Sequence, residues 1–202
     1  MMRMPAFAEL LLSVPAVLWA ITFHEFCHGY MAYILGDPTA KNAGRLSLNP
    51  LQHLDPVGAL MLLLFRFGWA KPVPIDPRYF KKPRRDMLLV SIAGVSGNFL
   101  TAFIFGMFAR FFPRVFLANA ALRQFVVLMI VINIGLAVFN LIPIPPLDGS
   151  KLLYPLLPPY MLEKFFWLER YGFFLLMILV ALGVVQMIMG PVVMFFLRLI
   201  LF

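Results

Sequence analysis

The sequence predicts an all-α polytopic membrane protein, and three observations carry that prediction. The 202 residues are 62% hydrophobic and only 13% charged, whereas a soluble domain is about 45–50% apolar and about 25% charged. Apolar runs recur along the chain, and several approach the roughly 20 residues that a membrane-spanning helix needs. The basic residues lie mainly between these runs, which is typical of charges that set the orientation of membrane helices.

We expect about four full spans, one short re-entrant segment and a C-terminal half-span, all within a single domain of residues 1–202. The first span begins near Pro5 and ends before Gly36-Asp37-Pro38, because Gly and Pro terminate helices. The remaining apolar runs are 87–109, 124–147, 171–189 and, beyond Gly190-Pro191, the tail 192–202, which is a half-span or a second leg after a kink.

Two shorter segments follow the first span. Residues 57–70 are apolar but too short for a full span, and they contain Arg66, so we interpret them as re-entrant. The polar stretch 37–55 contains Arg45-Leu46-Ser47-Leu48, whose alternation favours a small β-hairpin. The sequence thus predicts that the hairpin is the one non-helical element of an otherwise helical chain.

The distribution of Lys and Arg predicts the orientation. If 57–70 is re-entrant, residues 36–86 and 148–170 share one side of the membrane, which then carries twelve of the 17 basic residues. Cytoplasmic loops are enriched in Lys and Arg, so we expect this side to be cytoplasmic, in the cell membrane, and the N-terminus to lie outside. Spread over loops in this way, the net charge of +8 favours contact with the lipid bilayer and argues against a nucleic-acid partner. The oligomeric state stays open.

A metal-binding motif lies inside the first span, where His24, Glu25 and His28 form the pattern H-E-x-x-H. Helix positions four apart project from one face, so both imidazoles can bind one ion while Glu25 accepts a proton from a water that the ion acidifies. The structural alternative is that these three polar side chains only form hydrogen bonds with neighbouring helices. Ionisable groups within spans cost about 2.5–3.5 kcal/mol each on insertion scales, which favours the metal site.

A catalytic zinc usually has three protein ligands and one open position, so the chain must supply a third ligand. We predict Asp148, at the C-terminal end of the third span, with His53 and Asp55 in the loop before 57–70 as alternatives. If 57–70 is re-entrant, the ends of the first and third spans face the same side of the membrane, so that His28 and Asp148 can meet. We therefore expect one Zn²⁺ ion per chain.

Five segments, in the order "HEFCHG", "GRLSLNPLQHLDPVGAL", "GWAKPVPI", "AGVSGN" and "NLIPIPPLDG", resemble the site-2 protease family of intramembrane zinc metalloproteases. The resemblance covers residues 20 to about 155, and it is closest to the compact members without a PDZ or CBS domain. It implies that the zinc ligands are His24, His28 and Asp148, that Glu25 is the general base, and that Asn140 steadies the substrate carbonyl or oxyanion.

Two positions depart from the family pattern. Cys27 stands where Ser or Ala is more familiar, and we interpret it as a small packing residue; Val95 stands where a Pro often follows the Gly. Neither change removes a group that hydrolysis needs. We interpret Asn98 as a helix-packing amide, and the role of His53 stays open between a loop hydrogen bond and a place in the site.

The resemblance implies a zinc metalloendopeptidase that performs regulated intramembrane proteolysis. It would hydrolyse peptide bonds in or near the transmembrane segments of membrane-protein substrates, with its active site towards the cytoplasm. The alternative is a non-proteolytic metal-binding membrane protein. Such a protein would not need Glu25, and a transporter would carry charge in more of its spans, whereas 87–109 and 171–189 carry none.

Overall fold

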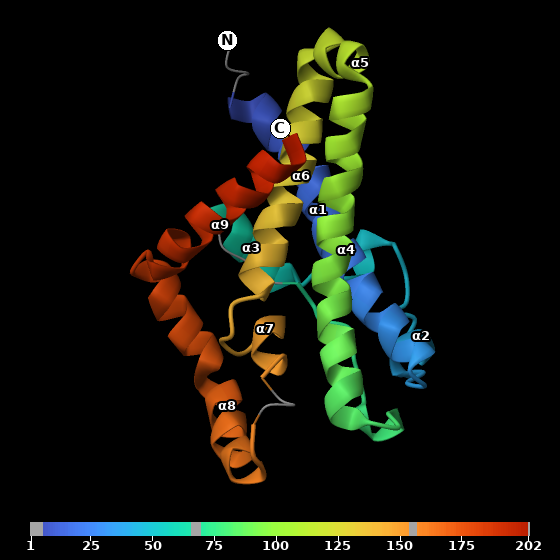
Figure 1. Ribbon diagram of the computed structural model, residues 1–202, viewed down its shortest axis with the longest axis vertical. Coiled ribbons are helices and arrows are strands. Elements are labelled where there is room, and N and C mark those ends of the chain that lie inside the picture. Colours follow the sequence, from blue (N-terminus) through green and yellow to red (C-terminus); the bar gives the residue numbers. More distant parts are fainter. Residues whose placement is uncertain (1–5, 66–69, 154–156, 202) are drawn as a thin grey trace.

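The computed structural model describes residues 6–65, 70–153 and 157–201, and within them the secondary structure is helical (Figure 1). The described residues contain no sheet, and their only β-pairing is an isolated bridge between Leu54 and Ala70. The helices in chain order are α1 (Ala6–Ile34), α2 (Thr39–Asn42), η1 (Pro50–Gln52), α3 (Pro56–Phe65), η2 (Pro77–Tyr79), α4 (Pro83–Phe111), α5 (Pro113–Ala118), α6 (Ala120–Asn140), α7 (Asp148–Lys151), α8 (Pro159–Ala181) and α9 (Val184–Leu201).

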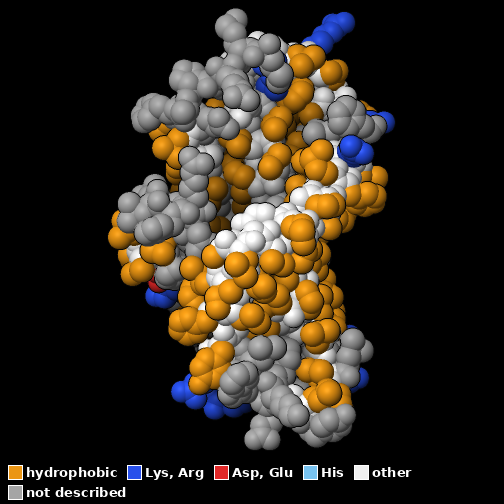
Figure 2. Space-filling view, turned by 90° about the vertical axis from the view of Figure 1, so that its left-hand side faces the viewer, with side chains coloured by type: hydrophobic (Ala, Val, Ile, Leu, Met, Phe, Trp, Pro, Cys, Tyr) orange, Lys and Arg blue, Asp and Glu red, His pale blue; other side chains and the backbone are white. Residues whose placement is uncertain are grey.

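Three of these helices are long and apolar enough to cross a membrane: α1 over Leu10–Ile34, α4 and α6. The segments Arg170–Ala181 and Val184–Ile200, which meet at 76°, make a fourth span if the bent pair counts as one. The described residues therefore hold three or four candidate spans, which confirms the helical membrane class. Hydrophobic side chains cover much of the described part of the face shown in Figure 2. With ten residues, α3 rises only about 15 Å, too little to cross the bilayer alone.

The three long helices pack against one another, and α9 packs across α6 and α4 (Figure 1). Small residues permit the close contact of α1 with α4: an added Cβ at Gly97 would lie 2.6 Å from the Cys27 sulfur. Cys27 therefore does fill a tight packing position between these helices. On α6, Ile130 and Ile134 are fully buried, and the buried Asn133 is the polar residue between them. This bundle fixes α1 and α4 in the register that builds the site.

The helix α8 begins at Pro159 rather than near residue 171, and three further helix boundaries differ from the sequence prediction. The fourth helix begins at Pro83 rather than near residue 87, because Pro suits the first helical position and Asp86 accepts a hydrogen bond from Lys82 N. The sixth ends at Asn140 rather than at 147, because the prolines in 143–146 cannot continue its hydrogen-bond ladder.

The third difference concerns the C-terminal bend, which we expected at Gly190-Pro191. It lies instead at Gly183, whose φ of 75° is a left-handed conformation that favours glycine, and Pro191 sits inside α9. Residues 192–201 thus continue the helix α9 that begins at Val184, and the predicted break at 190–191 does not occur.

The β-hairpin expected within 37–55 does not form, although the structure describes all of those residues. Asn49 instead accepts a hydrogen bond from Leu51 N and starts η1, and the Arg45 guanidinium donates to the carbonyls of Lys71 and Pro72. The alternation in 45–48 is too short to outweigh these local side-chain to backbone bonds.

Candidate metal centre

Two histidines on α1 form the first part of the site. His24 and His28 lie one turn apart and are both buried, and their rings meet edge to face with centroids 4.4 Å apart. The two Nε2 atoms are 2.9 Å apart. The four-residue spacing thus brings one nitrogen of each ring to a common point, as helix geometry requires.

Asp148 reaches the same point from α7. Its Oδ2 lies 3.0 Å from His24 Nε2 and 2.9 Å from His28 Nε2, and the carboxylate is buried. The turns after α6 fold back closely, since an added Cβ at Gly149 would lie 2.3 Å from the Leu141 carbonyl oxygen. We call these three residues the His–His–Asp group; each offers one ligand atom, and these atoms all lie within 4.8 Å of one another.

The donor set fits a zinc ion. His28 Nδ1 lies 2.7 Å from the Val90 carbonyl oxygen, which only accepts hydrogen bonds, so Nδ1 carries the proton and Nε2 presents its lone pair. Two imidazoles and one carboxylate are the ligand set of many catalytic zinc sites. A carbonyl that accepts a hydrogen bond from the outer ring nitrogen is typical of metal-binding histidines. The pocket is close-fitting, because an added Cβ at Gly94 would lie 2.5 Å from the His28 imidazole.

Glu25 lies next in sequence to His24, but its carboxylate contacts a different segment. Its Oε2 accepts a hydrogen bond of 2.8 Å from the backbone N–H of Val73. We call residues 71–76 the strap. Within it, Val73 is buried and lies between Pro72 and Pro74. Because proline has no N–H, Val73 supplies the one backbone donor of this Pro-Val-Pro sequence, and Glu25 receives it.

The structure places the other predicted residues as follows. Asn140, the last residue of α6, donates from Nδ2 to the Leu136 carbonyl oxygen at 3.1 Å, within its own helix. His53 is fully buried, and its Nε2 lies 2.8 Å from the Ser47 carbonyl oxygen. Asp55 accepts a hydrogen bond from Gly58 N. Neither His53 nor Asp55 joins the His–His–Asp group, so the loop hydrogen bond is the role that the structure gives His53.

Sequence reasoning missed one residue at the site. Asn98, interpreted as a packing amide, lies with its Oδ1 2.7 Å from His24 Nδ1. The signal was its spacing: Val90, Gly94 and Asn98 lie four apart on α4 and so share one helix face. This face contacts His28 and His24 at every turn.

Comparison with known proteins places the chain in a family. Residues 113–179 match Peptidase family M50. A protein of Bacillus subtilis (strain 168) named "Putative zinc metalloprotease YwhC" is 41% identical over 184 residues, which cover 88% of this chain and 84% of that protein. The chain belongs to peptidase family M50, the site-2 proteases. It is thus an integral membrane protein and an intramembrane zinc metalloprotease with Zn²⁺ as cofactor, and the alternative of a non-proteolytic metal-binding protein is not favoured.

Two more distant relatives carry the same description. Rip2 of Mycolicibacterium smegmatis, described in the same words as YwhC, is 27% identical over 176 residues, or 84% of this chain and 66% of its own. Rip2 of Mycobacterium tuberculosis (strain Erdman) is 31% identical over 150 residues, or 70% of this chain and 56% of its own. No solved structure matches the chain.

Proposed function

We propose that the His–His–Asp group binds one Zn²⁺ ion per chain and that Glu25 is the general base of the M50 protease. The observation that supports this is the convergence of two imidazole nitrogens and one carboxylate oxygen, 2.9–3.0 Å apart, from α1 and α7. We further propose that residues 1–202 act as a single membrane-embedded metalloprotease domain, because α1 and α7 supply the ligands jointly.

Held by His24, His28 and Asp148, a zinc ion would supply polarisation of the scissile carbonyl and would acidify a water molecule. The Glu25 carboxylate accepts the proton of that water and passes it to the leaving amine. The Val73 N–H holds one carboxylate oxygen, Oε2, and so leaves Oε1 for the proton transfer. Asn140 has two amide hydrogens and uses one on Leu136 O, so the second is available to a substrate oxyanion.

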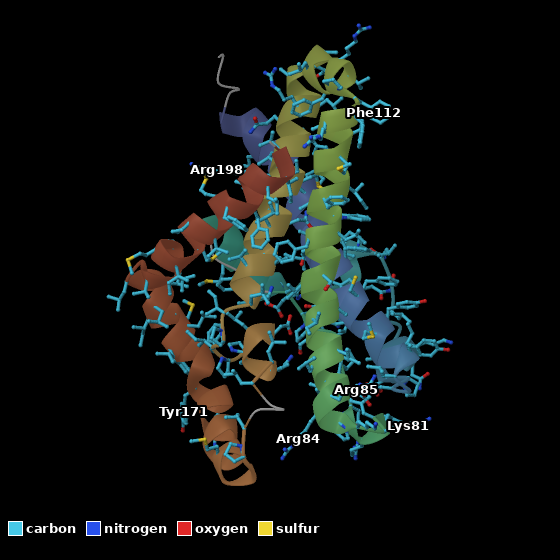
Figure 3. All side chains as sticks on the ribbon, viewed as in Figure 1. Lys81, Arg84, Arg85, Phe112, Tyr171 and Arg198 are labelled. Carbon is cyan, nitrogen blue, oxygen red and sulfur yellow. The ribbon has the colours of Figure 1, made fainter. Side chains whose placement is uncertain are left out.

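We propose that the substrates are transmembrane segments of other proteins, cleaved from the cytoplasmic side of the cell membrane. Lys81, Arg84 and Arg85 lie at one end of the molecule and Arg198 towards the other (Figure 3). His28 is six residues from the end of α1, and therefore about 9 Å along the helix from that end. A site at this depth, with α3 re-entrant, agrees with water reaching it from the basic side.

The experiment that tests this function measures zinc and cleavage together. We expect one zinc per chain in the protein purified in detergent, and cleavage of a membrane-protein substrate reconstituted with it in vesicles. Removal of zinc by a chelator should abolish cleavage, and Zn²⁺, but not Mg²⁺, should restore it, because imidazole ligands favour zinc. Full cleavage by the metal-free protein would contradict the proposal.

Changing Val73 to Pro should lower kcat by about 10- to 100-fold, the cost of a small misplacement of a catalytic group. The Val73→Pro variant has no N–H for the Glu25 carboxylate, whereas Val73→Ala keeps it. We therefore expect Val73→Ala to retain a kcat near the wild-type value. Cleavage rates at saturating substrate, with zinc content as the control, check this, and equal rates for the two variants would remove the strap from the mechanism.

Changing Gly94 to Ala should lower zinc affinity more than about tenfold, the scale seen when metal ligands lose their support. The added Cβ would meet both imidazoles, at 2.5 and 2.8 Å. Gly135→Ala on α6 is the matched control, because nothing lies within 4 Å of its added Cβ. Competition with a chromogenic chelator measures the affinity. A Gly94→Ala protein that binds zinc as tightly as Gly135→Ala would show that this close contact is not needed.

A further inference from the structure

Two asparagines inside the bundle connect α6 to the metal centre through α4. Asn133 and Asn98 are both fully buried, and both lie within candidate spans. Polar groups at such positions must find their partners inside the protein. The hydrogen bonds of these two side chains reach groups on α1, α4 and α6.

The direction of each hydrogen bond in this connection is fixed. Asn133 donates from Nδ2 to the Met129 carbonyl oxygen at 2.8 Å, so its Oδ1 is the atom that faces Asn98. Asn98 donates from Nδ2 to that Oδ1 and to the Ala20 carbonyl oxygen, both at 2.9 Å. Both amide hydrogens of Asn98 are then used, and its Oδ1 accepts from His24 Nδ1 at 2.7 Å.

This arrangement determines which nitrogen of His24 is free. The Asn98 oxygen can only accept, so His24 Nδ1 carries the proton and Nε2 presents a lone pair to the His–His–Asp group. A flipped Asn98 amide would put its oxygen against two other acceptors, the Ala20 carbonyl and Asn133 Oδ1. Unpaired buried oxygens cost about 1–3 kcal/mol each, so the flipped form is strongly disfavoured.

We propose that Asn98 and Asn133 are positioning residues of the zinc site, which hold the His24 ring with Nε2 towards the ion. Asn133 does not contact His24 and acts on it through its hydrogen bond with Asn98. This inference rests on the proposed role of the His–His–Asp group. The ordinary role of a buried asparagine in a membrane helix is to join helices, and that role predicts a loss of stability without a loss of metal affinity.

The test measures zinc affinity by chelator competition, and thermal stability, on the full chain in detergent. We expect Asn98→Ala to bind zinc about 10- to 100-fold more weakly, the scale seen when a residue hydrogen-bonded to a metal ligand is lost. Asn133→Leu should also bind zinc more weakly than the wild type. Asn133→Asp keeps an oxygen of the same shape for Asn98 Nδ2, so it should bind zinc more tightly than Asn133→Leu.

Thr101→Val is the matched control. Thr101 lies on α4, is buried, accepts from Trp19 Nε1 on α1 and donates to Gly97 O. Its loss removes a buried polar contact between the same two helices without touching the site. We expect lower stability and unchanged zinc affinity. The Co²⁺-substituted protein gives a second signal, since the visible absorption of the bound ion should change in Asn133→Leu and not in Thr101→Val.

The outcomes separate the two proposals. Wild-type zinc affinity and an unchanged Co²⁺ spectrum in Asn133→Leu would overturn the positioning role and leave the zinc site standing. Full zinc affinity in a protein whose His–His–Asp group has been substituted would overturn the proposed function itself. If Asn98→Ala does not fold, the Asn133 pair of variants and the Co²⁺ spectrum decide the question alone.

Discussion

A Glu25→Gln protein is expected to retain its zinc and to lose cleavage by a factor of about 10²–10⁴, the contribution of a positioned general base. Gln has the shape of Glu and keeps an oxygen to accept the Val73 N–H, so the strap and α1 should stay in place. It cannot take a proton from water, which is the step that we assign to this side chain. Single-turnover cleavage rates, with zinc content measured on the same samples, check the expectation.

Asp76→Asn is a suitable control, because it makes the same carboxylate-to-amide change elsewhere in the strap. The carboxylate of Asp76 pairs with the Arg78 guanidinium at 2.6 Å, and the hydrogen bonds from Arg78 hold the pKa of Asp76 below its usual range. This pair lies outside the candidate spans, and we expect the variant to cleave at the wild-type rate. Undiminished cleavage by Glu25→Gln would remove Glu25 as the base, whatever the control does.

The second large effect is expected for Asp148→Asn, which should lower zinc affinity by more than about 10²-fold. This exceeds the loss expected when a residue that only hydrogen-bonds a metal ligand is changed. The amide keeps the size of the side chain but loses the negative charge that meets the two imidazoles. A free zinc concentration of 1,000 times the Kd stabilises the folded protein by about 4.1 kcal/mol. A 10²-fold weaker affinity removes about 2.7 kcal/mol of this stabilisation, so the increase in Tm that zinc gives should be much smaller in Asp148→Asn than in the wild type.

Asp55→Asn provides the control for that prediction, since Asp55 was an alternative third ligand from the sequence. In the structure its carboxylate accepts from Gly58 N in the first turn of α3. We expect Asp55→Asn to bind zinc as the wild type does, with little loss of stability, because Asn caps a helix about as well as Asp. Full zinc affinity in Asp148→Asn, together with a loss in Asp55→Asn, would move the third ligand to Asp55.

The sequence predicted those parts of the site that depend on helix periodicity and on membrane topology. His24 and His28 follow from a spacing of four on one helix, and their encounter with Asp148 follows if the chain between them returns to the same side. Asn98 could not be assigned in this way. Its side chain is equally suited to joining helices, and its contact with His24 depends on the register that Gly94 and Gly97 permit between α1 and α4.

The boundaries of the elements were harder to predict for a different reason. Gly183 and Gly190-Pro191 can each interrupt a helix, and only the packing of the helices decides where the bend forms. The bend occurs at Gly183, and Pro191 is accommodated inside α9. The hairpin expected in 37–55 rested on four alternating residues. Arg45 uses its guanidinium on the strap, and this long-range contact has no signature in the local sequence.

The strap has a consequence for how the protein behaves beside its neighbours. The amide hydrogen of Lys71 goes to the His53 carbonyl, Pro72 has none, and that of Val73 goes to Glu25. The carbonyls of Lys71 and Pro72 accept from Arg45. Extended backbone with free donors and acceptors invites another chain to add a strand and aggregate. Both amide hydrogens and two of the three carbonyls of these residues are thus paired within the chain, so they offer little of such an edge to another copy of this protein.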